Sequence, residues 1–121
     1  MVHLLQDFKE LKVWARSHQL VLAIYKSTAG FPRTEQFGVT NQVRRASASI
    51  CANIAEGCGR NTSAELARFL EIAMGSASEV EYFLILARDL EYFNGDGFQK
   101  LYKDVTEVKR MLASLIQTVR G

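Results

Sequence analysis

Apolar residues recur at steps of three and four in four stretches of the chain, and short breaks that contain glycine or proline separate these stretches. Such spacing places apolar side chains along one face of an α-helix. We therefore predict helices over residues 8–28, 41–57, 63–92 and 98–119. No stretch shows the strict alternation of a half-buried strand. The pattern predicts an all-α fold, an antiparallel up-and-down four-helix bundle in which residues 1–121 form one domain.

Residues that favour helix ends lie at the predicted boundaries. Thr40 is a candidate cap for the second helix, and Gly57 and Gly59 are placed to end it, because glycine tolerates the left-handed conformation. Residues 62–65, Thr-Ser-Ala-Glu, form a capping box before the third helix, and Asp96 is placed to cap the fourth. The links between helices are therefore expected to be short.

The third helix carries two apolar rows. One row steps by four and three without a break and suits the core of a bundle: Leu66, Leu70, Ala73, Ala77, Val80, Leu84 and Ala87. The second row lies beside it and contains Phe69, Ile72, Phe83, Leu86, Leu90 and Phe93. Because one seam is enough for the chain's own core, the second row indicates a contact with another subunit.

The second helix combines an apolar face with a narrow polar stripe. Steps of four, four, three and four bring five polar side chains roughly into line: Arg45, Ser49, Asn53, Glu56 and Arg60. We expect Glu56 to pair with an arginine such as Arg45 or Arg60. Ser49, Asn53 and Glu56 are candidates for an assembly surface.

The net charge of +2 is small, but the charges are unevenly distributed along the chain. Residues 1–60 carry eight Lys or Arg against four Asp or Glu. Residues 61–95 carry two against six, and residues 96–121 carry five against three. This separation predicts either complementary packing between helices or a basic surface on one side of the molecule.

Four arginines on or near the second helix are candidates for binding nucleic acid. Arg44 and Arg45 lie within that helix, Arg60 follows it, and Arg68 lies early in the third helix. Guanidinium groups suit bidentate contacts with phosphate, which give affinity without reading sequence. The alternative is that these arginines pair with acidic residues of the third helix, namely Glu65, Glu71, Glu79 and Glu81.

The sequence shows no recognisable catalytic, cofactor or metal site. The Gly57-Cys58-Gly59 segment lacks the lysine and the preceding strand of a phosphate-binding loop, and neither histidine has the Glu-x-x-His spacing of ferritin-like metal sites. We therefore expect a protein that is not an enzyme and holds neither metal nor cofactor.

The cysteines and the hydropathy indicate a protein of the cytoplasm. Cys51 and Cys58 would lie about 10 Å apart along one helix, beyond disulfide reach, so we expect free thiols in a reducing compartment. No apolar run is long enough to span a membrane, and charged residues interrupt residues 1–10 where a signal peptide would be apolar. We expect no membrane association.

One pattern of residues resembles a known family. It consists of Phe31-Pro32, Glu35, Gln42, Arg44-Arg45-Ala46, Ser49-Ile50, Asn53-Ile54-Ala55-Glu56-Gly57, Arg60, Phe69-Leu70, Ala73 and Gly75-Ser76. These residues closely resemble the 23S rRNA intervening-sequence proteins, small bacterial four-helix bundles, and the resemblance extends from Phe8 to about Val119. Cys51 and Cys58 depart from the pattern, which has proline or a small residue at the first position and often an aromatic residue at the second.

The resemblance implies assembly as a homopentamer. A similar pattern occurs in the accessory variability protein of diversity-generating retroelements, a basic pentamer that binds nucleic acid and a reverse transcriptase. Our first hypothesis is therefore a non-catalytic, ring-forming bundle that binds structured RNA through arginines of the second helix and its exit. The second is a protein-interaction scaffold, without nucleic-acid binding, whose polar stripe serves assembly alone.

Overall fold

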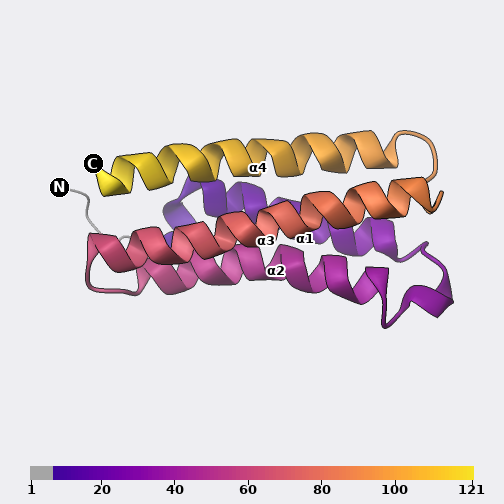
Figure 1. Ribbon diagram of the computed structural model, residues 1–121, viewed down its shortest axis with the longest axis horizontal. Helices are drawn as coiled ribbons and strands as arrows, with labels where there is room; N and C mark the ends of the chain where they lie inside the picture. The colour runs from indigo at the N-terminus through magenta and orange to yellow at the C-terminus, as the bar shows by residue number, and fades with distance from the viewer. Residues whose placement is uncertain (1–6) are drawn as a thin grey trace.

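The computed structural model describes residues 7–121, which form an antiparallel bundle of four long helices (Figure 1). The long helices are α1 (Lys12–Thr28), α2 (Val39–Cys58), α3 (Ser63–Asp89) and α4 (Gly97–Arg120), and two short 3-10 helices are η1 (Phe8–Glu10) and η2 (Arg33–Glu35). Each long helix packs against its neighbours in sequence, and α1 also packs against α4, which closes the bundle. The predicted all-α four-helix fold is confirmed.

Two helix boundaries differ from the prediction by three residues or more. α1 begins at Lys12 because Leu11 is extended, with φ −77° and ψ 128°, and separates α1 from η1. α3 ends at Asp89 rather than residue 92 because the chain turns back on itself there. Glu91 adopts a positive φ of 63°, and the Tyr92 N–H donates to the Ala87 carbonyl at 2.9 Å.

The helix caps follow the prediction only at α3. The Thr62 Oγ1 accepts a hydrogen bond from the Glu65 N–H at 3.1 Å, so that capping pattern is confirmed. Thr40 is buried inside α2, which begins one residue earlier, and the Oε1 of Glu35 accepts from the Val39 N–H instead. Asp96 precedes α4 but makes no capping hydrogen bond with its side chain. The predictions for Thr40 and Asp96 are therefore wrong.

The prediction that Gly57 and Gly59 end α2 in a left-handed conformation is also wrong. Gly57 lies within the helix, and Gly59 follows it with φ −86°. Gly57 instead permits close packing of α2 on α3. A Cβ at this position would lie 3.0 Å from both the Phe69 Cβ and the Leu66 Cδ1. The glycine is therefore needed for the approach of two helices and not for a turn.

The core contains the predicted first row of α3 and the apolar faces of the other three helices. Its fully buried large side chains include Leu20 and Ile24 of α1, Ile50 and Ile54 of α2, Leu70 and Leu84 of α3, and Val105 and Leu112 of α4. Helices α2 and α3 share the most extensive packing. The second row of α3 is only partly covered, since Ile72 is 41% and Leu90 45% exposed.

Candidate nucleic-acid interface

Arg44 joins the beginning of α2 to the end of α1. Its Nε donates to the Thr28 Oγ1 at 2.8 Å, and its Nη2 donates to the Tyr25 carbonyl at 3.2 Å. The guanidinium also lies over the Tyr25 ring, 4.6 Å from the ring centre. A cation at the end of α1 is favourable because the last carbonyls of a helix carry partial negative charge. Arg44 thus has three contacts with the end of α1.

Arg60 and Arg68 both lie over the ring of one buried phenylalanine, Phe69. Their guanidinium carbons are 4.8 Å and 4.5 Å from the centre of the Phe69 ring, a cation–π geometry. Arg60 pairs with Glu56 at 2.8 Å, and Arg68 pairs with Glu65 at 3.2 Å. The Arg68 hydrogen bond is the main reason that the pKa of Glu65 lies below its usual value. The expected pairing of Glu56 with an arginine is therefore confirmed for Arg60.

The four predicted arginines do not form one cluster. Arg44 and Arg60 are separated by 16 positions of sequence, which corresponds to about 24 Å along a helix. Arg44 and Arg45 lie near the beginning of α2, whereas Arg60 and Arg68 lie near its end. The prediction that these residues bind nucleic acid stays a prediction.

The middle of the polar stripe is a hydrogen-bonded contact between α2 and α3. The Ser49 and Ser76 hydroxyls lie 2.9 Å apart, and the Asn53 Nδ2 donates to the Ser49 carbonyl and hydroxyl at 2.9 Å and 3.0 Å. These half-buried groups hold the two helices in register. Sequence reasoning placed Ser49 and Asn53 in line but could not identify Ser76 as their partner.

Arg45 is the one of the four candidates with an exposed guanidinium and no ion pair in the described part of the chain. It lines a shallow polar groove of about 280 Å³ together with Gln42, Ala46, Ser49 and Glu79. Glu79 is the acidic member of this groove, but its carboxylate forms no ion pair within 4 Å among the described residues. The Arg45 side chain is thus available to an external anion.

Unpaired cations gather at one end of the bundle. There α1 ends, α2 begins, α3 ends and α4 begins (Figure 1). Residues 25–45 and 86–103, which we call the basic end, carry seven Lys or Arg against four Asp or Glu, whereas the remaining described residues carry eight against nine. Five exposed cations of the basic end have no carboxylate within 4 Å among the described residues: Lys26, Arg33, Arg45, Lys100 and Lys103.

The rest of the described chain has the opposite character. There, each Lys or Arg except Lys12 forms an ion pair, including Arg16 with Asp104, Lys109 with Glu81 and Arg120 with Glu71. An exposed cation without a nearby carboxylate attracts an anionic ligand more strongly than a paired one. The basic end is therefore the part of the surface best suited to phosphate.

The connector between α1 and α2 runs across the basic end and is firmly anchored. Glu35 accepts hydrogen bonds from the Tyr92 hydroxyl at 2.6 Å and from the Val39 N–H at 3.1 Å. These two bonds, the tyrosine bond first, lower the pKa of Glu35 below its ordinary 4.5, and the same carboxylate raises the pKa of Tyr92. Phe31, on the same connector, is buried against Tyr92 and Phe93. The Glu35–Tyr92 contact spans 57 positions, and no local pattern predicts it.

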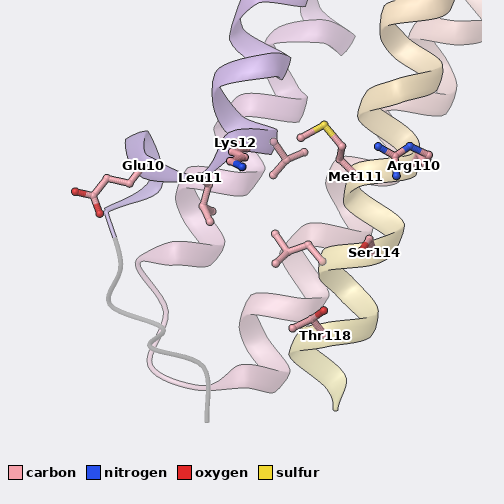
Figure 2. Close-up of a pocket in the computed structure, with 9 residues that line it drawn as sticks. Glu10, Leu11, Lys12, Arg110, Met111, Ser114 and Thr118 are labelled. Carbon is pink, nitrogen blue, oxygen red and sulfur yellow. The ribbon is translucent and has the colours of Figure 1, made fainter.

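A second groove lies away from the basic end, between the beginning of α1 and the last turns of α4. It has a volume of about 460 Å³, with the apolar side chains Leu11, Val13, Met111 and Leu115 and the hydroxyls of Ser114 and Thr118. Figure 2 shows Met111 reaching from α4 toward the beginning of α1. The charged residues Glu10, Lys12 and Arg110 complete its lining, so the groove is apolar inside with charges of both signs.

Residues 7–121 hold neither a metal-binding cluster nor a membrane-spanning helix. No group of three His, Cys, Asp or Glu side chains is placed to hold a metal ion in this range. Within the same residues, no helix has the length and hydropathy needed to cross a membrane. Both cysteines are free thiols, as predicted, and burial raises the pKa of Cys51 to about 11.

Comparison with known proteins supports the resemblance of the sequence pattern. Residues 9–114 match the family described as 23S rRNA-intervening sequence protein. The fold is similar to the crystal structure of a protein with unknown function from the S23 ribosomal protein family of Bacteroides thetaiotaomicron. The two share 30% sequence identity with a TM-score of 0.77, over 86% of this chain and 97% of that one. No curated protein matches the sequence.

Proposed function

We propose, from the premise that the chain belongs to the 23S rRNA-intervening sequence protein family, that it is a non-catalytic adaptor of the cytoplasm that binds structured RNA. In this proposal the bundle works as a homo-oligomer, a pentamer in the assembly that the sequence resemblance implies. The observation that carries RNA binding is the gathering of unpaired cations at the basic end.

The basic end is suited to phosphate contacts in three ways. Its unpaired cations are exposed, they come from α1, the connector, α2 and α4, and the basic end carries seven Lys or Arg against four Asp or Glu. Phosphate binding by such groups releases counterions and is therefore steeply dependent on salt. Arg45 is the predicted arginine that best fits this role, and Lys26 and Arg33 join it.

The other three predicted arginines have a second role in this proposal. Arg44 links α1 to α2, and Arg60 and Arg68 each pair with a carboxylate while covering Phe69. Exposed ion pairs of this kind contribute about 0–1 kcal/mol each, so a phosphate can compete for Arg60 and Arg68. Arg44 is less available because its contacts also join two helices.

Two exposed side chains of α3 support an oligomer. Ile72 and Tyr82 are 41% and 56% exposed, although large apolar side chains are favoured inside. Five copies in a ring would repeat the basic end around one axis and strengthen RNA binding through multivalency. A measurement of mass in solution tests the assembly, and a monomer at all concentrations would overturn it.

The proposed RNA binding is tested by titrating the purified protein against a structured RNA at several salt concentrations. The variants are Arg45→Glu and a matched control, Lys12→Glu. Lys12 is also exposed and unpaired, but it lies near the opposite end of the bundle. Both substitutions change the net charge by the same amount. A difference in RNA affinity between the two variants therefore reports the position of the charge.

We expect Arg45→Glu to weaken RNA binding. The slope of log affinity against log salt should become shallower by the amount expected for the loss of about one phosphate contact. Lys12→Glu should have the smaller effect. Equal losses in the two variants would show that net charge alone governs binding and would overturn the assignment of the basic end. No RNA binding at low salt would overturn RNA binding altogether.

That last outcome would favour the alternative, a protein-interaction scaffold. The hydrogen bonds among Ser49, Asn53 and Ser76 and the Glu56–Arg60 pair support this alternative, because they give most of the polar stripe a structural role. A scaffold of this kind would retain its oligomeric mass in the Arg45→Glu variant and would show no salt-dependent affinity for RNA.

A further inference from the structure

The connector between α1 and α2 presents one aromatic ring to solvent. Phe37 is 85% exposed, the highest value among the exposed large apolar side chains. The chain has seven phenylalanines, all within the described residues, and the other six are buried or partly buried. The Phe37 ring therefore contributes nothing to the core and is open to a ligand.

The backbone around Phe37 is held in one conformation. On one side, the Glu35 N–H and Gln36 N–H donate to the Pro32 and Arg33 carbonyls at 2.9 Å and 3.1 Å. On the other side, the Gly38 N–H donates to the Glu35 carbonyl at 2.9 Å, and α2 begins at Val39. The Glu35 carboxylate ties the same segment to Tyr92. An anchored connector presents its side chain with little loss of entropy on binding.

Both faces of the Phe37 ring are open. Guanidinium groups of the described chain cover the rings of Tyr25, Phe69 and Phe98, but no Lys or Arg lies over Phe37. Nor does Phe37 pair with another aromatic ring among the described residues. Arg33 lies on the same connector, and Lys26 and Arg45 lie on the two flanking helices, while the Glu35 carboxylate is held by Tyr92 and the Val39 N–H. None of these three cations has a carboxylate partner there.

We propose that Phe37 is a stacking platform for an unpaired RNA base, whose flanking phosphates contact the cations of the basic end. The proposal rests on the proposed RNA binding and specifies its substrate as RNA with accessible single-stranded or loop nucleotides. An exposed aromatic ring beside cations fits such a ligand because every base has a face that can stack, whereas bases inside a duplex are covered by their neighbours. The charge of the basic end is complementary to the phosphates on either side of that base.

The test compares a short oligoadenylate with a blunt RNA duplex of the same length, using the full chain. The variants are Phe37→Ala, Phe37→Leu and Phe37→Tyr, with Leu22→Ala as a control. Leu22 is a 51% exposed apolar residue of α1 outside the basic end. Because the Phe37 side chain is mostly in water, its truncation is expected to leave thermal unfolding unchanged.

We expect the wild-type protein to prefer oligoadenylate to the duplex. Phe37→Ala and Phe37→Leu should each weaken oligoadenylate binding by at least about fivefold, while Phe37→Tyr and Leu22→Ala should retain it. A variant with Phe37→Trp gives a direct reading, since stacking of a base should quench its added fluorescence. The natural Trp14 packs near the beginning of α1 and supplies the background signal.

Other results would separate the two proposals. If the protein binds RNA in a salt-dependent way but Phe37→Ala binds as well as the wild type, stacking is refuted and the phosphate surface stands. If Phe37→Leu retains full affinity, the contact is apolar and the stacking platform is again refuted. If neither probe binds at low salt, the proposed function and this inference both fall.

Discussion

The two helical glycines Gly57 and Gly75 predict opposite results for the same substitution. Gly75 lies inside α3 on the exposed surface, and an added Cβ would meet no atom within 4 Å. Alanine is favoured over glycine in a helix by about 0.5–1 kcal/mol. Gly75→Ala should therefore raise the free energy of unfolding by that amount and raise Tm by roughly 2–5 °C for a domain of this size.

Gly57→Ala has the same helical advantage but meets a crowded contact. The new Cβ would lie 3.0 Å from the Phe69 Cβ and 3.3 Å from the Leu66 carbonyl oxygen, which are parts of α3 that cannot rotate away. Overpacking of this kind costs about 1–3 kcal/mol. Both variants gain the same helical advantage, so it cancels when their free energies of unfolding are compared. The remaining difference should equal the packing cost at Gly57.

The assay is thermal and urea unfolding followed by far-ultraviolet circular dichroism, repeated at several protein concentrations because assembly makes Tm concentration-dependent. If Gly57→Ala were as stable as Gly75→Ala, the close approach of α2 and α3 would be refuted. If Gly75→Ala lowered stability and changed the mass in solution, the open surface at Gly75 would be refuted, and a neighbouring subunit would have to fill it.

Three further predictions concern individual contacts. Arg44→Ala should destabilise the protein by about 1–2 kcal/mol because it removes two hydrogen bonds and a cation–π contact between α1 and α2, and thermal unfolding would measure the loss. The pKa of Glu35 is lower in the folded state, so its contribution to stability is present above about pH 4.5 and is lost as the pH falls through the folded pKa; the slope of Tm against pH in this range should be smaller in Glu35→Gln. The pKa of Cys51 is raised to about 11, so iodoacetamide should alkylate its thiol slowly at pH 8 in the folded protein and quickly in urea, as mass spectrometry would show.

Each of these expectations has a control and a contradicting result. Arg44→Lys keeps the charge but not the forked geometry, so full stability in that variant would show that charge alone matters. Tyr92→Phe removes the first cause of the low Glu35 pKa, and an unchanged acid profile in this variant would contradict that cause. Rapid alkylation of Cys51 in the folded protein would show that α2 opens locally.

Helical periodicity predicted most of the fold because it depends on spacing within one element. The four helices follow from steps of three and four, and the Thr62–Glu65 cap is local in the same way. The start of α2 was missed for a physical reason. Its first N–H is capped by the Glu35 carboxylate, four residues earlier in the preceding connector, and not by a side chain at the usual capping position.

The site was harder to predict because pairing across helices cannot be read from spacing. The Glu56–Arg60 pair is separated by four residues and was foreseen, whereas the contact of Arg44 with Thr28 joins two helices. The distribution of charge along the sequence did not predict the basic end, for a related reason. Antiparallel helices bring residues 25–45 beside residues 86–103, so segments that differ in net charge along the sequence share one end of the bundle.

Because the bundle has an even number of antiparallel helices, its two ends are built differently. The beginning of α1 and the end of α4 lie at one end, and the α1–α2 connector and the α3–α4 turn lie at the other (Figure 1). The basic end is therefore formed around two chain reversals, and loops accept insertions and replacements more readily than packed helices do. Under the proposed function, substitutions of exposed residues in these two segments would change the RNA preference while the anchoring contacts of Phe31 and Glu35 hold the connector in place.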